Sequence, residues 1–242
     1  MKYIKSNNYD KTFVNDNLMG PNCMKILEEL LLSFDLQKGM RVLDLGCGKA
    51  LTSVFLAKEF GVKAFATDLW ISATKNYETI KSMNLEDQVI PIHADAKDLP
   101  FADEYFDAIV SIDSYYYFGA DADYMDKLAP LVKKGGTIAL AFPGVKNELK
   151  GKLPQEMMLS WAKAEDDILK TFHSIPWWRD LLEKSNKITV ESIQEMQCFE
   201  ETWQDWLTSE NEYADLSRND RLSMNAGAGK YMNIISIVAK RK

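Results

Sequence analysis

The stretch Val42-Leu43-Asp44-Leu45-Gly46-Cys47-Gly48-Lys49-Ala50 decides how this chain folds. It begins with a short apolar run that carries one acidic residue, and two glycines follow directly. A helix-like pattern starts at Leu51. This order indicates a strand that turns sharply into a helix. Glycines are expected in such a turn, because a side chain there would keep a ligand away from the backbone.

A second acidic residue, Asp68, ends the next apolar run about twenty residues later. Together with the glycine turn it predicts a crevice for a nucleoside, although Asp68 alone is equally well explained as a helix cap. A dinucleotide fingerprint needs a third glycine where Leu51 stands, and the phosphate-loop pattern is absent from the chain. We therefore expect a ligand that presents no phosphate to this turn.

Apolar runs and helical patterns alternate along the chain, which predicts an α/β fold with a doubly wound, mostly parallel, Rossmann-like sheet of seven strands. The last strand is expected to be antiparallel, and a helical insertion follows the fifth strand. The expected strands cover residues 41–45, 62–67, 88–93, 106–112, 137–142, 187–196 and 233–239. The expected helices cover residues 24–34, 51–60, 72–83, 124–132 and 203–213.

The chain shows no repeat, linker or low-complexity tract, so a single domain over residues 1–242 is expected. Residues 1–35 form an N-terminal arm and helix, and residues 143–180 form a lid-like insertion. Residues 1–20 are polar with isolated aromatic residues. They are interpreted either as a loosely ordered arm or as a lid that excludes water from a site, and the two alternatives stay open.

Composition narrows the classes of function. The chain has 242 residues, of which 46% are hydrophobic and 27% charged, as in ordinary soluble domains. A net charge of −7 argues against a nucleic-acid partner. The three cysteines are scattered without a CxxC pair, which favours neither zinc nor a disulfide framework. No apolar run reaches the length of a membrane span, and we expect a cytoplasmic protein without membrane insertion.

Several ordered motifs carry a family resemblance. They are Asp44-Leu45-Gly46-Cys47-Gly48, Asp68-Leu69, Asp95-Ala96 and the run from Phe106 to Val110. With these motifs the chain resembles a class I S-adenosylmethionine-dependent methyltransferase, within the ubiquinone/menaquinone-biosynthesis-like group that acts on small molecules. The resemblance is strong over about residues 36–142 and extends only to general shape over residues 187–242.

The resemblance implies an enzyme with S-adenosyl-L-methionine as its cofactor. It implies that the backbone of Gly46, Cys47 and Gly48 approaches the amino acid part, that Asp44 orients the ammonium group, and that Ser111 and Ile112 lie beside the methionine part. It further implies that Asp68 accepts hydrogen bonds from the ribose hydroxyls, that Leu69 and Trp70 pack on the adenine, and that Asp95 and Ala96 bind its edge. Cys47 is interpreted as a small turn residue and not as a nucleophile.

The acceptor side is expected to be formed by residues 113–118, directly after the fourth strand. Tyr116 stands about where many relatives have a histidine, and it either positions a substrate or belongs to an aromatic wall. Asp113 either orients a cationic substrate or caps a helix. His173 is a catalytic candidate in the insertion, together with Trp161, Trp177 and Trp178. These tryptophans either hold an amine by cation–π contact or form an apolar face for docking, and we favour docking. No metal site is expected.

The predicted function is methyl transfer to a small-molecule acceptor. The alternatives are a non-catalytic S-adenosylmethionine-binding protein and, less favoured, an RNA methyltransferase. An arsenite-type enzyme needs several thiols, and Cys23 and Cys198 alone do not supply them. The sequence selects neither an acceptor atom, nor a general base, nor an oligomeric state.

Overall fold

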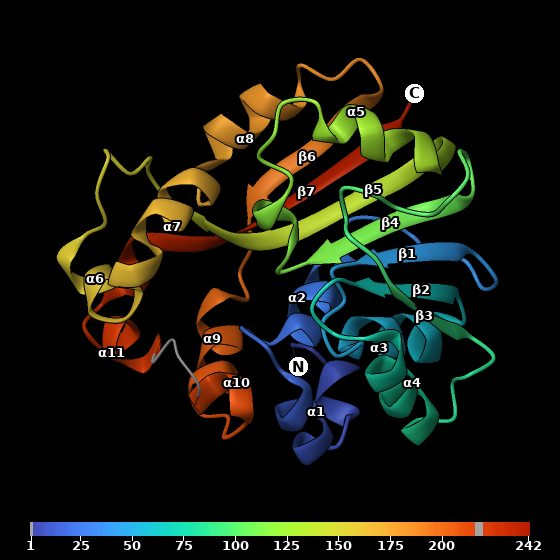
Figure 1. Cartoon of the computed structure of the whole chain (residues 1–242), viewed down its shortest axis with the longest axis horizontal. Coiled ribbons are helices and arrows are strands. Elements are labelled where there is room, and N and C mark those ends of the chain that lie inside the picture. The colour runs from blue at the N-terminus through green and yellow to red at the C-terminus, as the bar shows by residue number, and fades with distance from the viewer. Residues whose placement is uncertain (1, 216–219) are drawn as a thin grey trace.

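A computed structural model describes residues 2–215 and 220–242, in which seven strands form one sheet (Figure 1). Their order is β3-β2-β1-β4-β5-β7-β6. The strands β1 to β5 pair in parallel, whereas β7 runs antiparallel to both β5 and β6. The expected fold is therefore confirmed. The strands are β1 Arg41–Leu45, β2 Lys63–Asp68, β3 Val89–His93, β4 Phe106–Ile112, β5 Val132–Val145, β6 Ile188–Glu195 and β7 Met232–Arg241.

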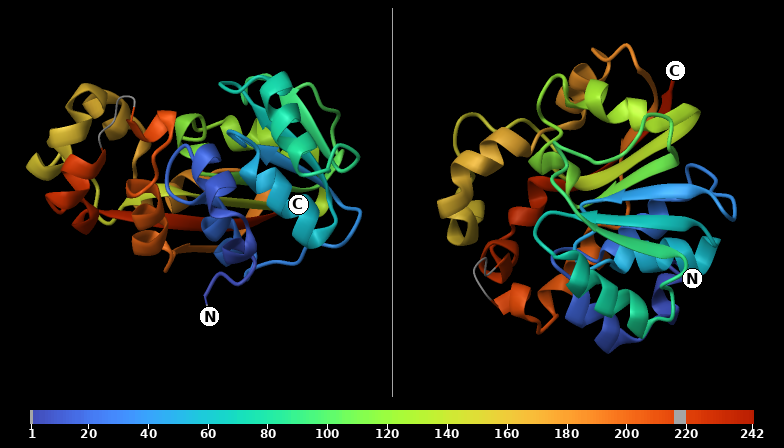
Figure 2. Two further views of the ribbon diagram at one scale, coloured as in Figure 1. Left: turned by 90° about the horizontal axis from the view of Figure 1, so that it is seen from below. Right: turned by 45° about the vertical axis from the view of Figure 1, so that its right-hand side comes forward.

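The sheet is covered by helices on both faces (Figure 2). One core cluster combines the sheet with buried side chains of α2, α3 and α4, and the other combines it with those of α5 and α8. This arrangement follows from right-handed crossovers between parallel strands. The helices are α2 Cys23–Leu30, α3 Leu51–Phe60, α4 Ala73–Ser82, α5 Tyr124–Leu128 and α8 Ile175–Leu182.

The strand and helix around the glycine turn lie where the sequence predicted them. β1 covers Arg41–Leu45 and α3 covers Leu51–Phe60. Gly61 ends α3 in the left-handed conformation, with φ +65°, and its N–H donates to the carbonyl of Ala57. Glycine adopts this conformation without the penalty that other residues meet, so the helix has a defined end.

The predicted helix over residues 124–132 is wrong in its second half. α5 ends at Leu128, a 3₁₀ turn covers Ala129–Leu131, and β5 begins at Val132. Pro130 has no N–H to donate and cannot continue an α-helix, which explains the early end. The predicted helix over residues 203–213 is likewise divided, into α9 Phe199–Leu207 and α10 Glu212–Asp215.

The insertion after β5 lies at the end of the sheet to which the parallel strands point, together with the helices that precede β7 (Figure 1). It consists of α6 Gln155–Trp161, a 3₁₀ turn at Ala162–Ala164, α7 Glu165–Thr171 and then α8. α6 packs against α11 Asp220–Asn225, where the N–H groups of Ser160 and Ser223 donate to each other's hydroxyl oxygens at 2.9 and 3.0 Å.

The N-terminal arm is docked on the domain by polar contacts. The Tyr3 hydroxyl donates to Glu29 of α2 at 2.6 Å, and the Tyr9 hydroxyl donates to Glu59 of α3 at 3.0 Å. A 3₁₀ turn at Ser6–Asn8 and α1 Lys11–Asn17 follow in order. Among the described residues, no helix has both the length and the apolar character that a bilayer crossing requires.

Candidate active site

The glycine turn at the end of β1 is fixed to the neighbouring strand. The N–H groups of Gly46 and Cys47 both donate to the carbonyl of Thr67 in β2, at 2.8 and 3.1 Å. Gly46 has φ +73°, and a Cβ at this position would lie 2.3 Å from the hydroxyl oxygen of Ser114. The protein's own packing therefore requires glycine here, which is a different reason from the ligand approach expected from the sequence.

Asp44 is fully buried below this turn. Its Oδ2 accepts hydrogen bonds from the hydroxyls of Thr52 and Ser53, at 2.6 and 2.5 Å. Its Oδ1 is buried with no hydrogen-bond partner among the described residues. Burial raises the pKa of the Asp44 carboxyl to about 6. An unsatisfied buried carboxylate oxygen is costly, so this atom is suited to a cationic group of a ligand.

Asp68 joins the glycine turn to the loop after β2. Its Oδ2 accepts from the N–H of Gly48 at 2.8 Å, and its Oδ1 accepts from the N–H groups of Trp70 and Ile71 at 2.8 and 2.9 Å. Burial raises the pKa of the Asp68 carboxyl. The side chain therefore holds the loop after β2 against the glycine turn, and it is not the cap of the next helix, because α4 is capped by Ser72. Oδ1 already accepts two hydrogen bonds and Oδ2 accepts one, so Oδ2 keeps a lone pair with which it can still accept from a ribose hydroxyl.

The loops after β2 and β3 lie side by side. The ring Nε2 of His93 lies 2.8 Å from the carbonyl oxygen of Leu69, and the N–H of Ala94 donates to the carbonyl of Asp68. Leu69 and Trp70 are half-exposed or more. His93 is exposed and ends β3.

The two residues predicted at the adenine edge lie in the loop after β3. The Oδ1 of exposed Asp95 accepts from the N–H of Lys97, and the carbonyl of Ala96 accepts from the Tyr124 hydroxyl at 2.9 Å. A hollow of about 280 Å³ opens beside Ala96, between this loop and α5. The hollow leaves space next to the predicted adenine position.

Three of the predicted cofactor residues direct their side chains into the protein. Ser111 is fully buried, and its hydroxyl donates to the carbonyl of Leu45 at 2.8 Å, which ties β4 to β1. Ile112 and Cys47 are also buried, and burial raises the pKa of the Cys47 thiol well above its usual range. A thiol held in this way is a poor nucleophile, as expected. The contacts of these three residues with the cofactor stay a prediction, and the structure adds that their side chains are packed inside the protein.

The residues after β4 bring an acidic group and aromatic rings together. Asp113 has φ +56°, and a Cβ on Gly20 would lie 2.3 Å from its Oδ2, so the arm reaches this carboxylate. The Tyr116 ring is buried, with its centroid 4.1 Å from that of Tyr117 and 5.1 Å from that of Phe172 in the insertion. Tyr116 is thus part of an aromatic wall, one of its two predicted roles.

His173 occupies a different setting from the one predicted for a catalytic group. Its Nδ1 lies 3.1 Å from a Glu148 carboxylate oxygen, its Nε2 lies 3.0 Å from the Lys170 carbonyl oxygen, and its ring stacks on Trp177 at 3.5 Å. Both ring nitrogens therefore have partners within the insertion. Trp178 is fully buried in the core, which supports the docking interpretation of these tryptophans.

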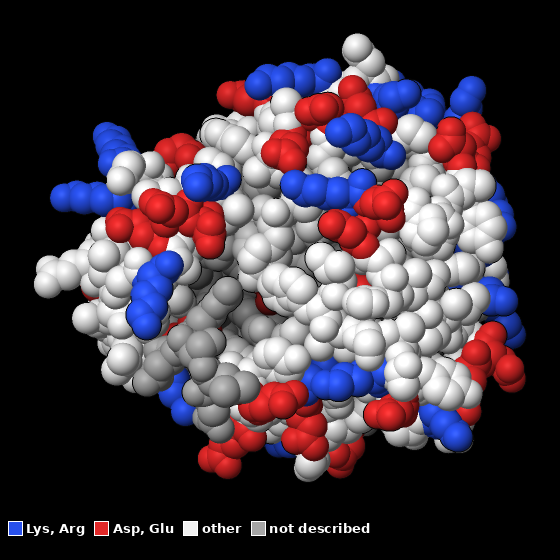
Figure 3. Space-filling model, in the orientation of Figure 1, with Lys and Arg blue, Asp and Glu red and all other residues white. Residues whose placement is uncertain are grey.

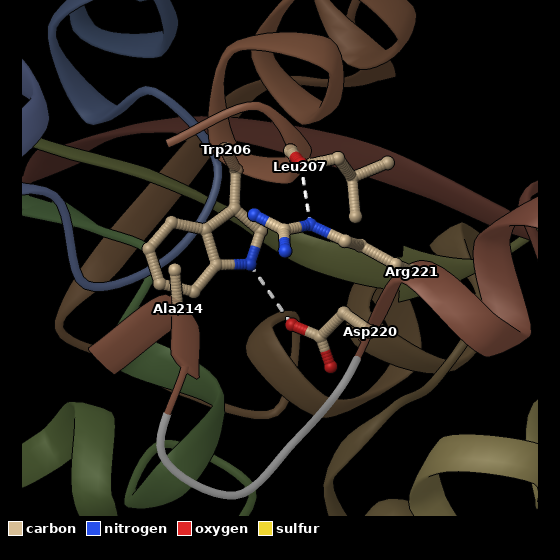
Figure 4. Close-up of a pocket in the computed structure, with 5 residues that line it drawn as sticks. All are labelled: Trp206, Leu207, Ala214, Asp220 and Arg221. Atoms are coloured by element: carbon tan, nitrogen blue, oxygen red, sulfur yellow. Dashed lines mark hydrogen bonds between the residues drawn. The ribbon is translucent and has the colours of Figure 1, made fainter. Parts of the chain in front are cut away.

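The insertion is joined to the C-terminal helices by a shared carboxylate. The indole N–H groups of Trp161 in α6 and Trp206 in α9 donate to the two oxygens of Asp220, at 2.6 and 2.9 Å. Figure 4 shows Trp206 and Asp220 beside Arg221, whose guanidinium donates to the carbonyl of Leu207. The cavity between them measures about 10 Å³. That is enough for about one water molecule, so it is no substrate site.

Sequence reasoning missed the contacts that cover the glycine turn. A Cβ on Gly48 would lie 3.0 Å from the sulfur of Met19, which follows α1. The side-chain amide of Asn211 donates to the carbonyls of Asn15 and Leu18, at 2.5 and 2.8 Å. Lys49 lies 3.1 Å from the Glu212 carboxylate. No local pattern predicts these partners, because they belong to separate segments of the chain, and Asn211 and Asn15 lie 196 positions apart.

Beside these elements the molecular surface is hollowed, as Figure 3 shows just to the left of the centre of the view. In the same orientation, Figure 1 places the hollow between the arrowhead of β4 and the helices of the insertion. Open α/β sheets bind ligands outside the carboxyl ends of their strands, so the hollow has the position expected of a binding crevice.

Comparisons with known proteins agree with this geometry. Residues 42–136 match the family model of a methyltransferase domain. Methyltransferase GfsG of Streptomyces halstedii is 32% identical over 122 residues, which are 48% of this chain and 42% of that protein. The chloroplastic tocopherol O-methyltransferase of Arabidopsis thaliana is 28% identical over 164 residues, which are 67% of this chain and 46% of that protein. The chain thus spans about half the length of these curated relatives.

A solved structure shows the same fold. The geranyl diphosphate C-methyltransferase of Streptomyces coelicolor A3(2), crystallised with S-adenosyl-L-homocysteine, superposes with a TM-score of 0.69 at 17% identity. The match covers 90% of this chain and 76% of that one. At this identity the likeness concerns the fold, and it agrees with the sheet order described above.

Proposed function

We propose that this chain is a class I S-adenosylmethionine-dependent methyltransferase that transfers a methyl group from S-adenosylmethionine to a small-molecule acceptor, and the match of residues 42–136 to a methyltransferase domain supports this proposal. The observation that carries the proposal is Asp44. A buried carboxylate oxygen without a described partner lies directly below the glycine turn of the matched domain. An ammonium group is the natural partner for such an atom, and the amino acid part of this cofactor has one.

The residues around the turn are suited to the rest of the cofactor. Asp68 would accept a hydrogen bond from a ribose hydroxyl through the remaining lone pair of Oδ2, in addition to the backbone groups that it already binds. Leu69 and Trp70 would offer apolar surface to the adenine, and Asp95 and Ala96 would bind its edge from the next loop. When bound, the cofactor supplies a methyl group on a positively charged sulfur, already activated for transfer.

The protein's own task is then to align the acceptor and to exclude water. The insertion would serve this task as a roof over the crevice, and its docking on α11 through Trp161 and Ser160 supports that role. Tyr116 would form part of the acceptor wall, and Asp113 is the carboxylate at the end of β4 that could orient an acceptor. We assign His173 to anchoring the insertion.

The proposed acceptor is a small molecule and not a nucleic acid, in line with the net charge of −7. We also propose a cytoplasmic location, which the three free cysteines support. No metal is required by the proposed chemistry, since the leaving group is part of the cofactor.

The test combines binding and transfer. We expect S-adenosylhomocysteine, but not NAD, to raise the melting temperature of the protein. Asp68→Asn is expected to weaken binding of S-adenosylhomocysteine in calorimetry, whereas Asp87→Ala, at an exposed loop position, serves as the control. Transfer of a radiolabelled methyl group is then screened against metabolite pools and RNA. Labelling of RNA alone, or binding without any transfer, would contradict the proposal.

A further inference from the structure

Two exposed aromatic residues, Trp70 and Tyr117, meet beyond the end of β1. Trp70 follows β2 and Tyr117 follows β4, and the sheet order places β1 with its glycine turn between those two strands. Neighbouring strands are about 4.8 Å apart, so the ends of β2 and β4 are separated by about 10 Å. The two ring centroids are nevertheless only 5.2 Å apart, with an angle of 64° between the ring planes. The rings therefore bridge the end of β1.

Both residues are held at their backbones while their rings stay open to solvent. The backbone N–H of Trp70 donates to Asp68 Oδ1 at 2.8 Å, so the backbone that carries the indole is fixed to the carboxylate assigned to the ribose. Tyr117 ends the 3₁₀ turn Tyr115–Tyr117, and its ring packs on Tyr116. Yet Trp70 is 63% exposed and Tyr117 is 39% exposed. Large aromatic surfaces left exposed beside a crevice are typical of ligand contacts.

We propose that Trp70 and Tyr117 form an aromatic clasp over the nucleoside half of the cofactor, with Tyr117 as a positioning residue that the sequence motifs do not indicate. This inference rests on the proposed function. A purine presents two flat faces and an apolar edge, and aromatic rings bind such surfaces by stacking or edge-to-face contact. In the structure the two rings contact each other edge to face, and the base would contact the same ring surfaces.

The clasp predicts which variants lose affinity. Trp70→Ala and Tyr117→Ala should each weaken binding of S-adenosylhomocysteine by about tenfold or more, as expected when a base loses an aromatic partner. Tyr117→Phe should bind like the unchanged protein, because the ring carries the contact. Tyr77→Ala removes another exposed ring, on α4, and serves as the matched control with unchanged affinity. The double variant should lose less than the product of the two single losses, because the rings act on one base.

Iodide quenching of tryptophan fluorescence gives a readout that does not depend on activity. Trp161, Trp178, Trp203 and Trp206 are buried, so iodide should reach mainly Trp70 and the partly exposed Trp177. S-adenosylhomocysteine should protect the accessible indole in the protein and in Trp177→Phe, but not in Trp70→Phe. If the unchanged protein binds and both alanine variants bind equally well without protection, the clasp is refuted and the proposed function stands. If the unchanged protein does not bind at all, both fail.

Discussion

Replacing Asp44 by asparagine should separate the stability of the fold from its affinity for the cofactor. Burial raises the pKa of this carboxyl from 3.8 to about 6. One pH unit corresponds to about 1.4 kcal/mol, so keeping the group ionised at pH 7.5 costs the native state about 3 kcal/mol. An uncharged amide avoids this cost and can still bond to the hydroxyls of Thr52 and Ser53.

We therefore expect Asp44→Asn to match or exceed the parent protein in unfolding free energy at pH 7.5, by at most about 3 kcal/mol. The same change should weaken binding of S-adenosylhomocysteine by about 10- to 100-fold, because a hydrogen bond between a charged donor and a carboxylate is lost. Urea denaturation measures the first quantity, and titration calorimetry measures the second. Two effects of opposite sign are hard to obtain from general damage to the fold.

The pH dependence has a defined direction. The native state keeps the Asp44 proton up to about pH 6, whereas the unfolded chain loses it near pH 4, so between these values the native state binds more protons. This contribution to stability is therefore present below pH 4 and is lost as the pH rises through 6. Cofactor affinity should change in the opposite direction and tighten as the carboxylate ionises. Equal affinity at pH 5 and 7.5, or unchanged affinity in Asp44→Asn, would refute this reasoning.

Three further predictions concern the parts that surround the crevice. Gly46→Ala should lower the unfolding free energy by about 2–4 kcal/mol, because the residue has a positive φ and the new Cβ would collide with Ser114. Gly39 also has a positive φ but open space around it, so Gly39→Ala should lower the unfolding free energy by only about 1–2 kcal/mol. Urea titrations measure both values. Trp161→Phe removes the indole donor from α6 and should lower the unfolding free energy by about 1 kcal/mol. It should also speed proteolysis within the insertion, and an unchanged cleavage rate would contradict the anchoring role of Trp161. Asn211→Ala should increase amide exchange in residues 11–20, and unchanged exchange would show that the arm is held by other contacts.

The elements around the crevice were predictable because short-range signals determine them. Gly61 ends α3, and the apolar run before Gly46 predicts β1 with the correct bounds. The failures have local causes as well. The apolar residues between 124 and 132 have helical spacing, which predicts a helix over the whole range. Pro130 has no N–H to donate, however, and the α-helix ends before it.

The acidic residues of the candidate site could be predicted from the sequence, but the contacts that cover the glycine turn could not. Asp44 and Asp68 follow directly from the strand-and-turn pattern, and the structure places both at the glycine turn. Ser111 was predicted to lie beside the cofactor, and the structure adds that its hydroxyl donates to the carbonyl of Leu45 and so ties the end of β4 to β1. The contacts of Met19 and Asn211 depend on how distant segments pack, and a single sequence contains no local signal for that packing.

The contacts at the start of α2 have a consequence for the order in which the protein matures. Asn22 donates to Asp205, its N–H donates to the carbonyl of Thr202, and Lys25 pairs with Glu201. All these partners leave the ribosome about 180 residues after the start of α2 does. While the chain is being translated, the arm can meet Glu29 and Glu59 early, but α2 completes its contacts with α9 only when synthesis is nearly over.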